Sequence, residues 1–299
     1  MKFTLWSVLT VMLLLPLQTH AGLAGIDVPG SKRLTVIDWG GAPITLWYLR
    51  GTETKADATI VFVMHGVGRD ADRYLAEWRD IALANDIVVV VPEYAQTHFP
   101  GSEGYNFGGV FDEAGKLQPR SRWAYSSIEP LFDALRNHEQ LTAEQYWLFG
   151  HSAGAQFVHR LVILGAGPRM VAAISANAGS YMFPVDDVDW PFGLRGAPKG
   201  SEAGVFASPM VLMLGDADSD PNHRSLPRQP AAMAQGPHRF ARGQNFYNTS
   251  RQIAERTHQS FNWSCVIVPG VAHDNAGIAR AAIRIIKGWK PIPGADCAR

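Results

Sequence analysis

The chain has 299 residues, of which 46% are hydrophobic, 18% charged and 10% aromatic, as in ordinary globular proteins with a sizeable core. Lysine plus arginine and aspartate plus glutamate number 27 each, without a basic run or an acidic tail. This balance argues against nucleic acid as a partner and favours a neutral cleft for uncharged substrates.

The N-terminal residues are typical of a cleaved signal peptide. Lys2 supplies a positive start, residues 3–15 are almost wholly apolar, and small residues end the segment at Ala21. A membrane-spanning helix needs about 20 apolar residues, so this run is too short to be one. We expect a signal peptide over 1–21, a mature domain over 22–299 without a membrane span, and a secreted or periplasmic location. An uncleaved membrane anchor is the alternative.

Export changes the interpretation of the two cysteines, Cys265 and Cys297. In an oxidising compartment a pair of cysteines is more often bridged than free. A bridge here would tie the C-terminal tail to the core and stabilise the fold by about 3 kcal/mol in the chain-entropy model. Two unpaired thiols are the alternative.

Short apolar runs alternate with segments of helical spacing along the mature chain. The runs predict buried strands at 59–64, 87–91, 146–149, 171–175, 209–214 and 263–268. Helices are predicted at 72–84, 127–138, 153–164, 245–258 and 276–289. This alternation indicates an α/β fold, a mostly parallel sheet with helices on both faces. We expect segments 34–37 and 44–49 to form an antiparallel edge of that sheet.

Two longer segments, 97–126 and 179–208, interrupt the alternation with glycine, proline and aromatic residues. Segments of this length in a compact domain are often functional loops, and here they would follow the carboxyl ends of strands. We expect them to form a small lid and the walls of a substrate cleft, with Trp123 and Tyr181 as candidate substrate-binding residues. Plain surface loops are the alternative.

The sequence Gly150-His-Ser152-Ala-Gly154 lies between a predicted strand and a predicted helix. A serine on such a sharp turn has a strained backbone, and side chains at positions 150 and 154 would collide with neighbouring elements. Ser152 is therefore a candidate nucleophile. The Ala153 N–H at the helix N-terminus is a candidate donor to a negatively charged oxygen.

A serine hydroxyl needs a base, and the base needs a carboxylate that orients it. His273 follows the last predicted strand in a loop with proline and glycine. Asp216, Asp218 and Asp220 follow the preceding strand, and Asp218 is preferred because its distance from the strand end lets it reach over the sheet edge. After an early strand comes His65-Gly-Val67-Gly, where the Val67 N–H is the candidate second oxyanion donor and His65 a brace for the loop.

Four motifs, each at a strand end, follow one another in an order that resembles the α/β-hydrolase superfamily. They are His65-Gly66, Gly150-His-Ser152-Ala-Gly154, Gly215-Asp-Ala-Asp218 and His273. The resemblance is to secreted esterases of the polyhydroxybutyrate-depolymerase and feruloyl-esterase kind. It implies a serine carboxylesterase with a Ser-His-Asp triad, an acyl-enzyme intermediate, no metal or organic cofactor, and a small or oligomeric ester as substrate. A serine peptidase and a catalytically dead binding protein on the same fold are the alternatives.

Overall fold

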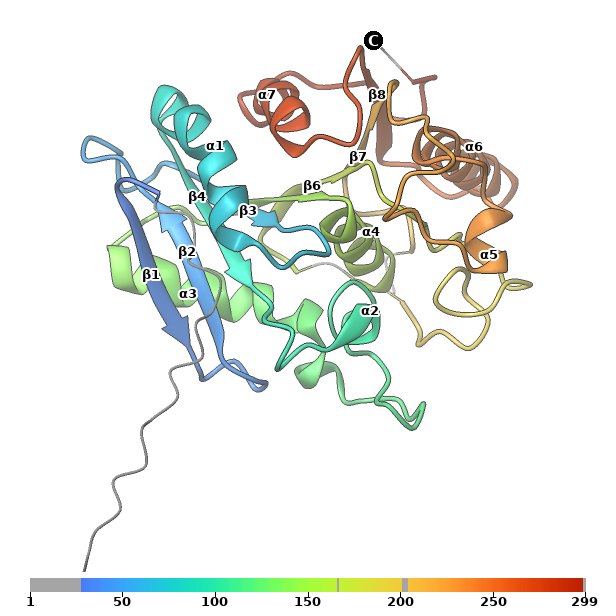
Figure 1. Cartoon of the computed structure of the whole chain (residues 1–299), viewed down its shortest axis with the longest axis horizontal. Helices are drawn as coiled ribbons and strands as arrows, with labels where there is room; N and C mark the ends of the chain where they lie inside the picture. Colours follow the sequence, from blue (N-terminus) through green and yellow to red (C-terminus); the bar gives the residue numbers. More distant parts are fainter. Residues whose placement is uncertain (1–27, 166, 201–203, 298–299) are drawn as a thin grey trace, which may run out of the picture.

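A computed structural model describes residues 28–165, 167–200 and 204–297. One eight-stranded sheet crosses the molecule in the order β1-β2-β4-β3-β5-β6-β7-β8 (Figure 1). Its strands are β1 (Ser31–Val36), β2 (Ile44–Leu49), β3 (Thr59–Met64), β4 (Ile87–Glu93), β5 (Tyr146–His151), β6 (Met170–Ala176), β7 (Met210–Gly215) and β8 (Trp263–Val268). The predicted signal peptide lies outside the described residues.

The six neighbouring strands β4, β3, β5, β6, β7 and β8 are parallel to one another. At the edge of the sheet, β1 pairs with β2 and β2 pairs with β4 in the antiparallel sense. The predicted parallel sheet with an antiparallel edge is thus confirmed. β3 and β4 are almost wholly buried along their length, as their continuous β-branched runs predict for strands covered on both faces.

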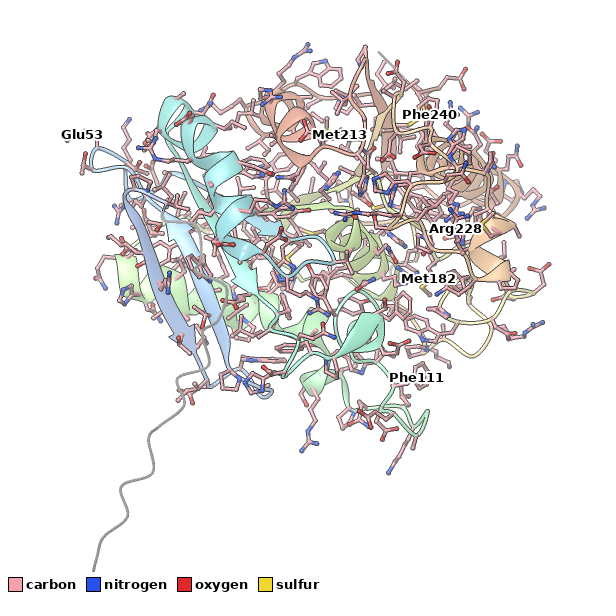
Figure 2. All side chains as sticks on the ribbon, viewed as in Figure 1. Glu53, Phe111, Met182, Met213, Arg228 and Phe240 are labelled. Atoms are coloured by element: carbon pink, nitrogen blue, oxygen red, sulfur yellow. A yellow bond between two sulfur atoms is a disulfide. The ribbon has the colours of Figure 1, made fainter. Side chains whose placement is uncertain are left out.

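Helices cover both faces of the sheet. One face carries α1 (Ala71–Asn85) and α7 (Asn275–Ile286), whose residues Trp78 and Ile278 belong to one buried cluster. The other face carries α3 (Ile128–Glu139), α4 (Ala153–Gly165) and α6 (Arg239–Arg256), which share a second cluster. Figure 2 shows side chains filling the layers on either side of the sheet. This sheet with helices on both faces is the α/β architecture that the sequence indicates.

Helix α6 begins at Arg239, six residues before the start predicted for it. Its first turns bury Arg239, Arg242 and Gly243 instead of large apolar residues, and a Cβ at Gly243 would meet Leu214 at 2.3 Å. Hydrophobic periodicity cannot detect a helix face made of arginine and glycine, which explains the difference.

The two segments predicted as insertions touch each other. The first contains α2 (Gly101–Gly104) and two 3-10 turns, Arg120–Arg122 and Ala124–Ser127. Phe111 in the first insertion, labelled in Figure 2, meets Trp190 in the second edge to face, with ring centroids 5.8 Å apart. The short helix α5 (Pro230–Met233) lies in a later loop, between β7 and α6.

The predicted disulfide is present and joins Cys265 of β8 to Cys297. The tail before Cys297 is also held by hydrogen bonds: the Gly294 N–H donates to the Trp263 carbonyl, and the Tyr247 hydroxyl donates to the Ala295 carbonyl. The bridge therefore fastens a segment that already packs against β8 and α6. Among the described residues, no helix combines the length and apolar character needed to span a bilayer.

Candidate active site

Ser152 sits on a sharp turn between β5 and α4, in a backbone conformation that L-residues rarely adopt. Its φ is +59°, and its N–H donates to the Ala176 carbonyl over 3.0 Å. A Cβ at Gly150 would lie 2.3 Å from the Gly154 carbonyl oxygen, and a Cβ at Gly154 would lie 2.0 Å from that of Met64. Both distances are far below van der Waals contact, so the two glycines are what lets strand, turn and helix pack this closely.

The loops that follow β7 and β8 bring an aspartate and a histidine to this turn. His273 Nε2 is 3.0 Å from Ser152 Oγ, and His273 Nδ1 is 2.7 Å from Asp218 Oδ2. Asp218 is buried, with 3% of its surface exposed. Because its carboxylate accepts the Nδ1–H, the Nε2 atom is left as an acceptor for the serine hydroxyl.

The other two candidate carboxylates are engaged elsewhere. Asp216 Oδ1 accepts from the Gly270 N–H over 2.7 Å, and Asp220 Oδ1 accepts from the Asn222 N–H over 2.8 Å. The structure therefore brings Asp218, and not Asp216 or Asp220, to the imidazole.

The loops that carry Asp218 and His273 are in close contact with each other. The Ala217 N–H donates to the Val271 carbonyl over 3.1 Å, and a Cβ at Gly215 would lie 2.2 Å from the same oxygen. This contact fixes the position of one loop relative to the other.

The two candidate oxyanion donors lie on two segments that contact each other, the start of α4 and the loop after β3. Ala153 is the first residue of α4, where N–H groups have no partner within the helix. The Val67 N–H has no acceptor among the described residues, and the Val67 side chain is 62% exposed. A Cβ at Gly154 would also lie 2.9 Å from the His65 carbonyl oxygen, so the loop with Val67 rests against the start of α4.

His65 braces that loop, as its position in the sequence suggests. Its Nδ1 lies 3.0 Å from the Gly66 carbonyl, and its Nε2 accepts from the Tyr94 N–H over 3.1 Å. The two partners require the neutral tautomer with the proton on Nδ1. Burial lowers the pKa of His65 to about 4, which keeps the ring neutral at physiological pH.

His151, which the sequence left without an assignment, packs against the imidazole of His273. The ring centroids are 4.6 Å apart at an angle of 35°. His151 Nδ1 is 3.2 Å from the Tyr74 hydroxyl, whereas its buried Nε2 has no partner among the described residues. Burial, with a smaller contribution from His273, holds the pKa of His151 well below its usual value.

Two further residues near the site were missed by sequence reasoning. Arg239 Nη1 lies 3.4 Å from Asp218 Oδ1, and the ring of His223 meets that of His273 with centroids 5.1 Å apart. Arg239 opens a helix and His223 lies in the loop after β7. Neither position belongs to a motif, and Arg239 lies 21 positions after Asp218 in the chain, so no sequence signal pointed to this contact.

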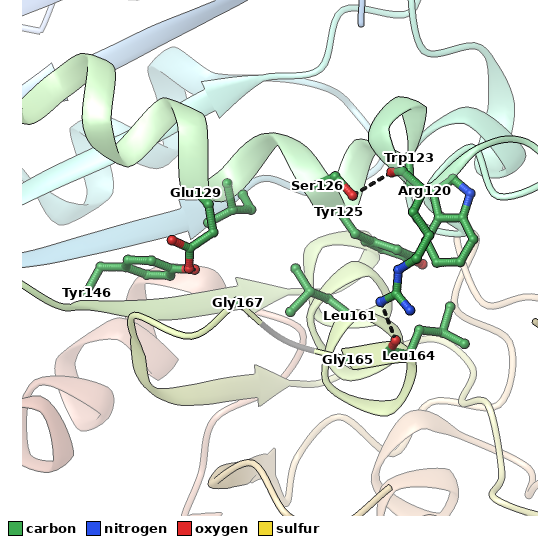
Figure 3. Close-up of a pocket in the computed structure, with 11 residues that line it drawn as sticks. Arg120, Trp123, Tyr125, Ser126, Glu129, Tyr146, Leu161, Leu164, Gly165 and Gly167 are labelled. Atoms are coloured by element: carbon green, nitrogen blue, oxygen red, sulfur yellow. Dashed lines mark hydrogen bonds between the residues drawn. The ribbon is translucent and has the colours of Figure 1, made fainter. Parts of the chain in front are cut away.

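The structure places both candidate substrate-binding aromatics in buried positions. Trp123 is buried and lines a cavity of about 200 Å³ with Arg120 and Leu164 (Figure 3). Leu164 is at the C-terminal end of α4, whereas Ser152 precedes its N-terminus. Helix α4 rises about 1.5 Å per residue, so this cavity is well over 10 Å from the serine. Trp123 thus lies on a cavity at the far end of α4 from Ser152.

Tyr181 packs within the core. Its side chain has no exposed surface, its ring stacks on Phe246 with centroids 4.6 Å apart, and its backbone is held by the Gln235 side chain. An aromatic residue in a loop can face the cleft or the core, and the sequence pattern does not distinguish the two.

Solved structures identify the family. Poly(aspartic acid) hydrolase-1 from Sphingomonas sp. KT-1 is 39% identical over 87% of this chain and 99% of its own, with a TM-score of 0.82. A poly(3-hydroxybutyrate) depolymerase from Bordetella parapertussis is 32% identical over 88% of this chain and 91% of its own, with a TM-score of 0.81.

A more distant structure, carboxyl esterase 2 from Tuber melanosporum, shares the fold at 12% identity and a TM-score of 0.54, over 88% of this chain and 87% of its own. No family profile matches the chain, and no curated protein matches it significantly. With two relatives above 30% identity along most of its length, the chain belongs to the α/β-hydrolase superfamily as a hydrolase of the esterase type.

Proposed function

We propose that the chain is an exported serine hydrolase that cleaves carboxylic esters through Ser152, His273 and Asp218. The observation that carries the proposal is the continuous row of contacts, 3.0 Å from Ser152 Oγ to His273 Nε2 and 2.7 Å from His273 Nδ1 to Asp218 Oδ2. A row of hydroxyl, imidazole and carboxylate in this geometry activates serine for attack on a carbonyl.

In the first half of the reaction, Ser152 Oγ attacks the ester carbonyl carbon while His273 Nε2 takes the hydroxyl proton. The carbonyl π electrons move onto the oxygen and give a tetrahedral oxyanion, and Asp218 stabilises the imidazolium. When the intermediate collapses, the bond to the alcohol oxygen breaks. His273 returns its proton to that oxygen, and the acyl group stays on Ser152.

In the second half, His273 Nε2 takes a proton from water, and the resulting hydroxide oxygen attacks the acyl carbon. Collapse of the second tetrahedral intermediate breaks the bond to Ser152 Oγ, which recovers the proton from His273. The products are a carboxylic acid and free enzyme, so one ester and one water are consumed per cycle.

The N–H groups of Ala153 and Val67 would donate to the oxygen in both tetrahedral intermediates. Support comes from their place beside Ser152 and from the lack of a competing acceptor for Val67. Each such donor typically contributes a factor of about 10²–10³ to turnover.

Cleavage of an amide bond is the second candidate function. It is favoured by the 39% identity to a protein named for the hydrolysis of poly(aspartic acid), whereas the 32% identical protein is named for a polyester. The proposed row suits either bond, because an amine leaving group takes its proton from the same His273 Nε2.

Export of a mature domain over 22–299 is part of the proposal. Its support is the signal-like composition of residues 1–21 and the disulfide, since such bridges persist in oxidising compartments. Fractionation of producing cells, with mass measurement of the mature N-terminus, tests this part.

The test of the mechanism has two stages. First, a fluorophosphonate probe should label the wild-type protein and not Ser152→Ala. Ser175→Ala, which loses a buried hydroxyl that donates to the Ala155 carbonyl, should still be labelled. Second, p-nitrophenyl esters graded by acyl length should be compared with peptide anilides, poly(aspartic acid) and poly(3-hydroxybutyrate). Labelling of Ser152→Ala would refute the proposed nucleophile, and absence of labelling and turnover in the wild type would favour a binding protein.

A further inference from the structure

A buried arginine shares the carboxylate of Asp218 with His273. Arg239 Nη1 lies 3.4 Å from Oδ1, while His273 holds Oδ2, and the side chains of Arg239 and Asp218 are only 1% and 2% exposed. Burial lowers the pKa of Arg239 and Asp218 raises it, but an arginine stays protonated under all working conditions. Asp218 therefore faces a buried guanidinium at one carboxylate oxygen and the imidazole of His273 at the other.

The same arginine is connected to a second histidine beside His273. Arg239 Nη2 donates to Ser225 Oγ over 2.9 Å, and Ser225 Oγ lies 3.2 Å from His223 Nδ1. His223 Nδ1 also accepts from the Ser225 N–H, so His223 is neutral in this arrangement. Burial, followed by Arg239, lowers the pKa of His223.

We propose that Arg239 is a positioning residue that acts through Asp218 to set the pH range in which His273 is a free base. This inference rests on the proposed function. Without a counter-charge, a buried carboxylate next to a neutral imidazole would be an uncompensated buried charge, which is costly. Arg239 supplies the counter-charge. Its positive charge also disfavours the addition of a proton to the Asp218–His273 pair, so the pair stays in its active form at lower pH.

Other charged and titratable groups face the same pair. They are His151 at the end of β5, with Tyr74 and Arg73 of α1 near it, His223 and Asp220 in the loop after β7, and Tyr181. Among the described residues, Arg239 is the arginine or lysine with an ion pair to Asp218. A change in charge at Arg239 should therefore affect the pair directly.

The test compares the pH profile of kcat/KM in four proteins: wild type, Arg239→Met, Arg239→Gln and Arg239→Lys. Removing the positive charge should move the midpoint of the acid limb to higher pH by about one unit. Arg239→Gln keeps a donor for Ser225 and should shift the midpoint in the same way. Arg239→Lys keeps the charge but carries it on a different stem, so its shift should be smaller.

The matched control is Arg242→Met. Arg242 is also buried in the first turns of α6, but it donates to the carbonyl oxygens of Gly236, Gly179 and Pro227. Among the described residues it has no carboxylate partner. Loss of a buried arginine from this helix should lower the melting temperature of both methionine variants, but only loss of Arg239 should move the midpoint.

An Arg239→Met or Arg239→Gln protein that folds and has the wild-type midpoint would overturn the inference, as would an equal shift in Arg242→Met. If both charge-free variants fail to fold, Arg239→Lys decides: a midpoint close to that of the wild type is expected because the positive charge is kept, and a rise of a full unit despite the retained charge would overturn the inference. Failure of the proposed function has a different signature: the wild type would then show no hydrolysis that depends on Ser152, at any pH.

Discussion

His273 Nε2 lies 3.0 Å from Ser152 Oγ although 121 residues separate them along the chain. This contact gives the most direct prediction. Ser152→Ala should lower kcat/KM for a soluble ester by a factor of about 10⁴ or more, because no other group would form the acyl-enzyme. The melting temperature should stay close to that of the wild type, since the change removes one hydroxyl that faces the site and leaves the core unchanged. Ester assays and a thermal melt on the same preparation check both halves, and retained hydrolysis would place the nucleophile elsewhere.

Gly154→Ala should damage both stability and activity. The new Cβ would lie 2.0 Å from the Met64 carbonyl oxygen and 2.9 Å from that of His65. Because both oxygens belong to the backbone, they cannot move aside as a side chain could, and α4 must move away from β3. Overpacking of this kind costs about 3 kcal/mol in the free energy of unfolding. Gly196→Ala is the comparison: its φ is +77° but no atom lies within 4 Å, so backbone strain of about 1 kcal/mol should be its only effect. Urea unfolding measures both, and equal losses would contradict the steric argument.

Acid should weaken the fold before carboxylates titrate, because several histidines are buried in the neutral form. His65 has its pKa lowered to about 4, and His159 and His151 have theirs lowered well below the usual value. A base whose folded pKa is lowered binds protons more readily in the unfolded chain, whose pKa is about 6.5. Its stabilising contribution is complete above pH 6.5 and is lost as the pH falls toward 4, about 3 kcal/mol for His65 alone.

Urea unfolding between pH 7.5 and 4.5 measures this slope. The exposed His258 offers a control, and His258→Gln should show the same slope as the wild type. A free energy of unfolding that stays constant over this range would contradict the neutral buried histidines.

Removal of the disulfide should lower stability without altering the proposed chemistry. The bridge closes a loop with a sequence separation of 32, so Cys265→Ser with Cys297→Ser should lose about 3–4 kcal/mol in the chain-entropy model. Wild-type protein unfolded in excess reductant should match the double variant, and kcat/KM below the melting transition should be unchanged. A double variant as stable as the oxidised wild type would contradict a stabilising role for the bridge.

The parts of the fold and site that could be predicted from sequence are those set by strand ends. Six buried strands produce continuous apolar runs, and in a parallel sheet their carboxyl ends meet at one edge. Polar residues just after those runs, namely Ser152, Asp218 and His273, therefore lie together in space. The glycines at positions 150 and 154 also indicate, from sequence alone, that the turn at Ser152 leaves no space for a Cβ at either position.

The remaining parts depend on packing that leaves no periodic signal. Arg239 reaches Asp218 from a helix whose first turns bury arginine and glycine, so neither the helix start nor the contact follows from hydrophobic spacing. The buried position of Trp123 has the same origin. Its indole N–H donates to the Gln118 carbonyl and its ring is buried. This orientation is determined by the conformation of the loop, which the residue type does not predict.

The contact between Gly215 and the Val271 carbonyl has a consequence for engineering. Lengthening the loop after β7 or the loop after β8 by one residue should displace both Asp218 and His273, because the two loops pack against each other. Their lengths therefore cannot be varied separately. The segments 97–126 and 179–208 contribute no member of the proposed row. Exchange of these segments between related enzymes should therefore leave Ser152, His273 and Asp218 in place, provided that Tyr105, whose hydroxyl donates to the His65 carbonyl over 2.8 Å, is kept.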